Sequence, residues 1–184
     1  MATIPELTTA EEFETICQEI GPCELVRGEI VKLSPGGLGH SEFSNNVAYL
    51  LTKWAKSGGS GRVLGCEAGI IVEVGPDTVR GADVAYISYD RLAKGKRPRG
   101  FLRVPPNLIV EILGQGQGWR DMVEKAGEYL RMGVDRVWVI DPDAEALHVF
   151  RSDAEPKRLT ASDELSDVAV LPGFSCKVAD IFSD

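Results

Sequence analysis

One acidic residue lies inside an apolar run of the chain. The segment NLIVEIL (residues 107–113) has the pattern of a buried β-strand, with Glu111 among Leu, Ile and Val side chains. An ionised carboxylate in such a strand carries a heavy desolvation penalty unless a cation pairs with it or a metal ion is bound by it. The chain must therefore fold so that Glu111 faces a partner.

The remaining segments alternate between helix and strand patterns. Thr9 and Glu12 form a capping-box pattern ahead of a short helix, and Arg27-Gly28 is typical of a hairpin turn. Helices are predicted at 11–20, 40–59 and 119–133, and strands at 24–33 (a hairpin), 62–74, 82–88, 107–113, 134–142 and 146–151. This order of elements predicts an α/β fold with helices around a mixed sheet.

Two of the predicted strands each carry one carboxylate on an apolar face. Because side chains alternate along a strand, Asp83 shares a face with Ala85, and Glu111 shares one with Ile109. If the strands are neighbours with these faces aligned, Asp83 and Glu111 meet, and two buried carboxylates favour a hard divalent cation. The alternative is that either residue lies near a strand end, where it points to solvent or caps a backbone group.

A lysine flanks the apolar stripe of the helix at 119–133. Asp121, Lys125 and Glu128 fall on one line at i, i+4 and i+7. The stem of Lys125 can lie along the core edge while its ammonium steadies a nucleophile or the charge that develops on phosphate. The alternative is a surface pair with Asp121, worth about 0.2–0.5 kcal/mol.

Composition limits the class of protein. A chain of 184 residues fits one globular domain, and 20 Lys and Arg against 28 Asp and Glu give a formal net charge of −8. This charge disfavours indiscriminate binding to nucleic acid. Without a secretory-signal pattern or 18 consecutive apolar residues, we expect a cytoplasmic protein that does not interact with membranes. The four cysteines include no CxxC pair, which predicts reduced thiols rather than a zinc cage.

One segment is strongly basic. The connection from Arg91 to Arg103 (RLAKGKRPRGFLR) holds six Lys and Arg and no acidic residue. Such a segment can contact the phosphates of a nucleic acid. It can equally be a solvated loop.

Several segments together resemble the Uma2 family (DUF820), which is assigned to the PD-(D/E)xK nuclease superfamily. They are ELVRGEIVKLSP followed by a histidine, GADVAYIS, PPNLIVEIL, the helix with Lys125 and Tyr129, and above all GVDRVWVIDPDAEALHVF. The resemblance implies a restriction-endonuclease-like core, a mixed β-sheet flanked by helices, with a divalent-metal site. We expect an N-terminal helix in 1–21, this core in 22–151 and a C-terminal extension packed on the same domain in 152–184.

The resemblance also implies roles for single residues. Asp83 matches the superfamily's aspartate and Glu111 the acidic residue of the (D/E)xK strand, both as ligands of Mg²⁺ or Mn²⁺. The lysine expected two residues later is absent, and Lys125 matches the position on the next helix to which this family has moved it. His40 matches a histidine common in the family, although a lone histidine is more often a cap or structural hydrogen-bonding residue. Glu29 is an additional candidate metal ligand.

Two hypotheses of different classes follow. The first is a Mg²⁺- or Mn²⁺-dependent endonuclease that hydrolyses phosphodiester bonds in nucleic acid. The second is an inactive domain of the same fold that serves as a protein-interaction or regulatory module. Metal binding distinguishes them. A homodimer fits the first hypothesis, because endonuclease-like folds often act on duplexes in pairs, but no residue specifies it, and the sequence does not distinguish DNA from RNA.

Overall fold

Over the residues that the structure describes, the main sheet is mixed and has eight strands. The structure, a computed structural model, describes residues 7–58 and 60–183. The strand order is β2-β1-β4-β5-β6-β7-β8, and β3 pairs with β4 outside this path. The strands are β1 (Cys23–Val26), β2 (Glu29–Lys32), β3 (Gly61–Glu73), β4 (Thr78–Ser88), β5 (Leu108–Ile112), β6 (Arg136–Asp141), β7 (Ala146–Arg151), β8 (Ala154–Thr160), β9 (Glu164–Ser166) and β10 (Ser175–Lys177). The helices are α1 (Ala10–Ile20), α2 (Leu38–Gly58), α3 (Trp119–Met132) and α4 (Ala179–Phe182).

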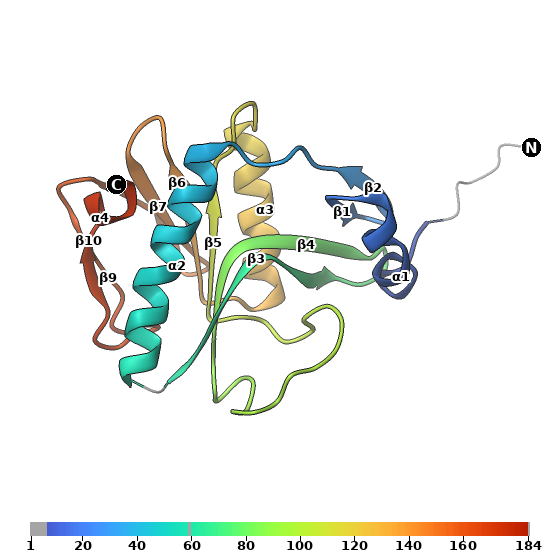
Figure 1. Ribbon diagram of the computed structural model, residues 1–184, viewed down its shortest axis with the longest axis horizontal. Helices are drawn as coiled ribbons and strands as arrows, with labels where there is room; N and C mark the ends of the chain where they lie inside the picture. The colour runs from blue at the N-terminus through green and yellow to red at the C-terminus, as the bar shows by residue number, and fades with distance from the viewer. Residues whose placement is uncertain (1–6, 59, 184) are drawn as a thin grey trace, which may run out of the picture.

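Helices α2 and α3 cover opposite faces of the sheet, α2 in front and α3 behind it (Figure 1). Alternation along β5 divides its side chains between the two layers. Val110 packs with Leu51 of α2, whereas Ile109 packs with Tyr129 of α3. The predicted mixed α/β fold with flanking helices is confirmed, and the same alternation directs Glu111 toward α3.

The predicted N-terminal helix and hairpin are confirmed. Glu12 N–H donates to Thr9 Oγ1 at 3.3 Å, and Thr9 N–H donates to a carboxylate oxygen of Glu12 at 2.8 Å, which completes the capping box. Arg27 and Gly28 both adopt positive φ, 51° and 80°, in the tight turn between β1 and β2. Residues 1–6 lie outside the described part of the chain. Among the described helices, none is long and apolar enough to cross a membrane.

The sheet forks between β4 and β5. Their antiparallel pairing runs only from Tyr86–Leu108 to Val84–Val110, whereas β5 continues along β6 as far as Ile112. Beyond Val84, toward its N-terminus, β4 keeps its pairing with β3 and gains β1 as a neighbour through the pair Val79–Leu25. We call α1, β1 and β2 the wing and β5–β8 with α3 the body; β4 belongs to both sides of the fork (Figure 1).

The segment after residue 151 completes the sheet and covers one of its ends. Strand β8 pairs antiparallel with β7 at the sheet edge, and β9 and β10 form a separate two-stranded sheet. Leu165, Leu171 and Phe174 pack into the same core as helix α2. The segment expected as a C-terminal extension packed on the same domain thus contributes side chains to the main core.

The long connection between β4 and β5 is anchored on β3. Leu102 N–H donates to the carbonyl of Gly69 at 2.8 Å, and Ile71 N–H donates to the carbonyl of Leu102 at 3.0 Å. The ring of Phe101 lies against Gly69 and stacks on Phe13 of α1, with centroids 5.6 Å apart. The absence of a side chain at position 69 thus lets the connection dock between the wing and β3.

We expect Gly69→Ala to lower the free energy of unfolding by about 1–3 kcal/mol, because the added Cβ would collide with the Phe101 ring. The measurement is urea denaturation followed by circular dichroism. Gly37→Ala is the matched control, since a Cβ at Gly37 would meet nothing within 4 Å. Equal stability of the Gly69 variant and wild type would show that the connection is not held at this point.

Candidate active site

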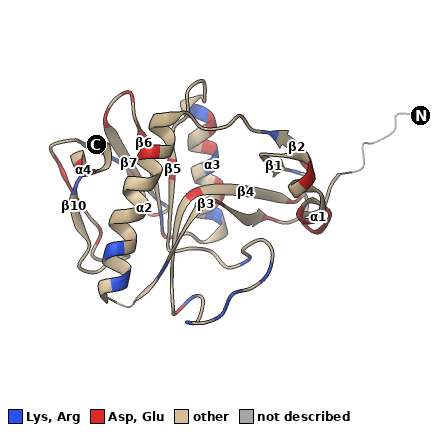
Figure 2. Cartoon of the chain, viewed as in Figure 1, with Lys and Arg blue, Asp and Glu red and all other residues tan. Residues whose placement is uncertain are grey.

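Asp83 and Glu111 meet at the fork. The register Val84–Val110, extended by one pair, sets Asp83 opposite Glu111. Both are largely buried, with exposed fractions of 8% and 3%. Because the β4–β5 ladder has ended, the N–H of Ile112 is free to donate to Asp83 Oδ2, at 2.7 Å. Figure 2 shows acidic positions on β4 and β5 beside the mixed charges of α3.

Both oxygens of Glu111 accept hydrogen bonds from α3. Tyr129 Oη donates to Oε1 at 2.7 Å, and Lys125 Nζ donates to Oε2 at 2.9 Å. Burial raises the pKa of Glu111 to about 7, against the lowering effect of the Lys125 charge, while the Asp83 charge raises it further. The rise is mainly the desolvation cost of a buried carboxylate, which the charge of Lys125 and the hydrogen bonds from Lys125 and Tyr129 offset only in part.

Lys125 lies at the centre of the charged cluster. Its ammonium donates to Glu111 at 2.9 Å and to the carbonyl of Gly81 at 3.2 Å, and it lies 3.1 Å from Glu24 Oε1. An ammonium has three donors, so these three acceptors match it in its charged form. Lys125 thus contacts Glu24 of the wing, Gly81 of β4 and Glu111 of the body. These buried contacts differ from the surface pair with Asp121, which was the alternative in the sequence analysis.

Arg80 binds two buried acids, Glu24 and Glu128. Its Nε and Nη2 donate to the two carboxylate oxygens of Glu128 at 2.7 and 2.9 Å, and its Nη1 donates to Glu24 Oε2 at 2.8 Å. Although burial alone would raise it, the charges of Lys125 and Arg80 hold the pKa of Glu24 below its usual value. The network joins the wing, β4 and α3.

His40 reaches the site from the first turn of α2. Its Nε2 lies 3.4 Å from Asp83 Oδ2, and this interaction raises the pKa of His40 despite partial burial. Opposite Asp83, strand β3 has a bulge in which Cys66 and Glu67 both adopt positive φ, 60° and 54°. The structure therefore brings together four predicted site residues, Asp83, Glu111, Lys125 and His40.

Glu29 is not among the residues that gather at the fork. It lies on β2, whose four residues are all exposed, and pairs through its backbone with Val26. The acid that the hairpin does send into the site is Glu24, which is 5% exposed and which sequence analysis missed. Its signal was the one used for Glu111, a carboxylate flanked by apolar residues in a strand, here Cys23 and Leu25.

The chemistry of the site fits a hard divalent cation. Glu24, Glu111, Glu128 and Asp83 give four carboxylates against the two permanent cations of Lys125 and Arg80, so the buried cluster carries an excess of two negative charges when all four carboxylates are ionised and His40 is neutral. Within residues 7–58 and 60–183, no three His, Cys, Asp or Glu side chains are gathered as a complete cage. Mg²⁺ fits such a site, because it commonly keeps several waters and binds through one or two carboxylates and substrate phosphates.

Comparison with known proteins identifies the fold and the family. A crystal structure from Anabaena variabilis ATCC 29413, titled a "putative nuclease belonging to DUF820", superposes with a TM-score of 0.81 at 18% identity, covering 95% of this chain and 97% of that chain. This likeness confirms the predicted endonuclease-like fold. No curated protein matches. Residues 10–179 match the Uma2 family, described as "putative restriction endonuclease", over a longer stretch than the 22–151 of the sequence resemblance. The chain belongs to the Uma2 family.

Proposed function

We infer that the protein is a divalent-metal-dependent endonuclease that hydrolyses phosphodiester bonds in nucleic acid. The observation that carries this proposal is the meeting of Asp83 and Glu111 at the fork, with Lys125 hydrogen-bonded to Glu111. Membership of the Uma2 family supports a nuclease-like activity with a nucleic-acid substrate. The excess negative charge of the buried cluster supports the requirement for a cation.

In this proposal Asp83 and Glu111 hold Mg²⁺ or Mn²⁺, which when bound supplies an activated water and offsets charge on the phosphate. Tyr129 and Ile112 N–H fix the orientation of the two carboxylates through hydrogen bonds of 2.7 Å. Lys125 keeps its proton and acts as a donor, and its longest contact, 3.2 Å to the carbonyl of Gly81, is the one it exchanges for a phosphate oxygen or the attacking water.

His40 supports the same step through Asp83. Its imidazole faces the carboxylate oxygen that also accepts from Ile112 N–H, so it restrains Asp83 from a second side. A histidine in this place can also donate to a phosphate oxygen once the substrate is bound. The proposal assigns no role at the fork to Glu29, because its strand is exposed.

The first test is Mn²⁺ binding by calorimetry on wild type, Glu111→Gln and Glu29→Gln. We expect one saturable site in wild type, at least roughly tenfold weaker binding in Glu111→Gln because a ligand charge is lost, and unchanged binding in Glu29→Gln. Circular dichroism verifies that each variant is folded. Equal loss in the Glu29 variant would instead support the additional ligand that the resemblance implied.

Cleavage is measured next, with supercoiled plasmid, linear single strands and RNA in Mg²⁺, Mn²⁺ or EDTA. We expect metal-dependent cleavage of at least one substrate. A folded wild type that binds no metal, alone or with nucleic acid present, would contradict the proposal and favour the inactive interaction module.

A further inference from the structure

The basic connection between β4 and β5 is fixed to the rest of the fold at both ends, and one of its arginines, Arg91, forms hydrogen bonds within the protein. Arg91 donates to Asp135 at 2.7 Å and to the carbonyls of Pro105 and Pro106 at 3.1 and 2.7 Å. At the other end of the connection, Leu102 is bridged to Ile70 of β3. The guanidinium of Arg91 therefore already has partners within the protein. The Lys and Arg residues that follow it lie on a segment that is fixed at both ends.

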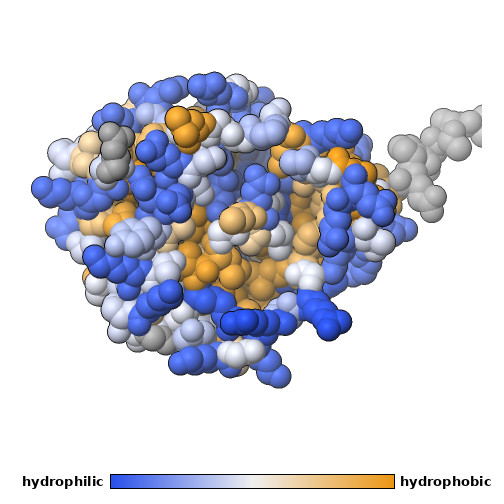
Figure 3. Space-filling view, in the orientation of Figure 1, coloured by the Kyte–Doolittle hydropathy of each residue, from blue (hydrophilic) through white to orange (hydrophobic). Residues whose placement is uncertain are grey.

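The segment lines an open pocket of about 500 Å³ with an apolar floor. Leu92, Leu102 and Val104 form this floor, and all three pack into the core under α3. The ring of Phe101 closes one side while its face stacks on Phe13. In the orientation of Figure 1, hydrophobic surface lies in the middle of the molecule and strongly hydrophilic side chains border it below (Figure 3). Figure 2 shows basic residues of the connection in this lower border.

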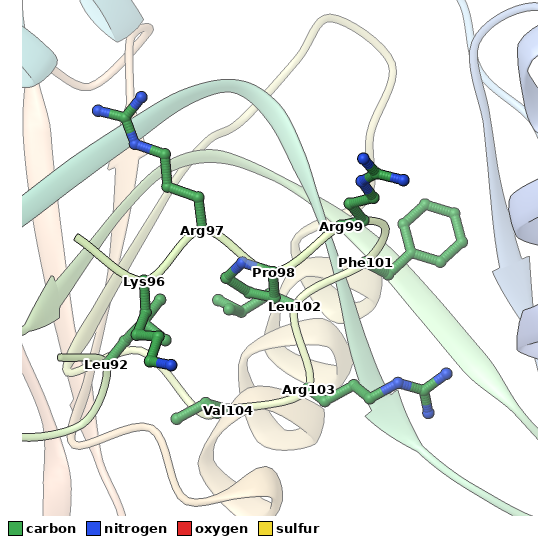
Figure 4. A pocket seen from close by; sticks show the side chains of 9 residues that line it. All are labelled: Leu92, Lys96, Arg97, Pro98, Arg99, Phe101, Leu102, Arg103 and Val104. Carbon is green, nitrogen blue, oxygen red and sulfur yellow. The ribbon is translucent and has the colours of Figure 1, made fainter. Parts of the chain in front are cut away.

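The rim of the pocket is cationic. Lys96, Arg97 and Arg99 are exposed, and within the described part of the chain none of them forms an ion pair. Arg103 pairs with Glu11, but both side chains are more than half exposed, so the pair contributes little. In Figure 4 the guanidinium groups of Arg97, Arg99 and Arg103 extend away from Leu102 in different directions. On a chain with a net charge of −8, this rim favours a polyanion.

The pocket lies close to the fork. Leu102 is bridged to Ile70, and Ile70 pairs with Arg80 of β4, whose neighbour Gly81 contacts Lys125. Two strand spacings separate Leu102 from Arg80, which is about 10 Å. The backbone of the pocket floor at Leu102 therefore lies near the part of β4 that contacts Lys125 at the fork.

We propose that this pocket binds an unpaired nucleotide of the nucleic-acid strand, with its base on the apolar floor and its neighbouring phosphates on Lys96, Arg97 and Arg99. The proposal rests on the proposed nuclease function and narrows its substrate to nucleic acid with a single-stranded segment. Bases of a duplex are covered by their partners and neighbours, whereas an unpaired base has a free face for an apolar surface. An acidic peptide would use the rim and leave the floor exposed.

The test measures binding of a fluorescent single-stranded DNA oligonucleotide to the full chain in EDTA, where no cleavage occurs. We expect the single strand to bind about tenfold more tightly than its duplex and than an abasic strand of equal length, because stacking of one base is worth roughly 1–3 kcal/mol. Arg97→Ala/Arg99→Ala should weaken binding and reduce the slope of log affinity against log salt by about 1.4, at ~0.7 for each phosphate contact on a single strand. The matched control is Lys53→Ala/Lys56→Ala, which removes the same charge from exposed positions on α2.

Four results would overturn the pocket assignment: duplex bound as tightly as single strand, abasic strand bound as tightly as normal strand, equal losses in the two double variants, or polyglutamate bound as tightly as DNA. The failure of this proposal is distinguishable from failure of the nuclease. If the protein shows the binding pattern but cleaves no substrate, the pocket assignment stands and the proposed nuclease activity fails. If the protein cleaves in Mn²⁺ without the binding pattern, the nuclease activity stands and the pocket assignment fails.

Discussion

Replacing Lys125 with methionine is expected to lower the rate of phosphodiester cleavage by about 10²–10³-fold, the usual effect of removing one donor that stabilises transition-state charge. Methionine retains much of the side-chain volume and removes the ammonium, which contacts Glu111, Glu24 and the carbonyl of Gly81. The rate is measured with saturating Mn²⁺ and substrate, so that weaker metal binding does not account for the loss.

Two comparisons separate this role from a structural one. Lys53→Met, at an exposed lysine of α2, should cleave as wild type does. Lys125→Met should still bind the oligonucleotide in EDTA, because the pocket lies on the connection between β4 and β5. A folded Lys125 variant that cleaves at the wild-type rate would remove Lys125 from the mechanism and leave it as a structural cation.

Replacing Arg80 with methionine is expected to lower the free energy of unfolding by about 3–5 kcal/mol, as is typical when one partner of a buried ion pair is removed. Arg80 compensates Glu24 and Glu128, which are 5% and 4% exposed. Without the guanidinium both carboxylates stay in the interior, Glu128 with no cation in contact among the described residues and Glu24 with Lys125 alone. Urea denaturation monitored by circular dichroism gives the difference.

The matched control for Arg80 is Arg151→Met. Arg151 pairs with Asp153 at 3.0 Å, but their side chains are 42% and 71% exposed, so we expect a change below about 1 kcal/mol. Similar losses in the two variants would show that burial of the Glu24–Arg80–Glu128 network has little energetic consequence.

The sequence predicted the pair of acids because its signal is local. Alternation along two short strands is enough to orient Asp83 and Glu111, and the structure sets them opposite one another. The fork is not local, because it depends on where the β4–β5 ladder ends and on which strand β4 joins next. For that reason the position of Lys125 between Glu24 and Glu111 could not be read from the helix alone.

The hairpin and the basic connection show two further limits. Glu24 and Glu29 lie in similar β-rich surroundings in sequence, and only the tertiary packing buries the first and exposes the second. Arg91 and Arg97 belong to the same basic run, yet Arg91 pairs with Asp135, 44 residues away, while Arg97 extends from the pocket rim. Burial of a charge is decided by partners that are distant in the chain, so local pattern cannot assign it.

The fork makes the geometry of the site depend on a peripheral hairpin. Strand β2 is an edge strand with every residue exposed, yet its partner β1 carries Glu24, which contacts Lys125 and Arg80. A loosened wing would withdraw one of the three acceptors that position the ammonium beside Glu111. If the protein cleaves as proposed, we therefore expect substitutions on the hairpin that displace Glu24 to slow cleavage in a protein that remains folded.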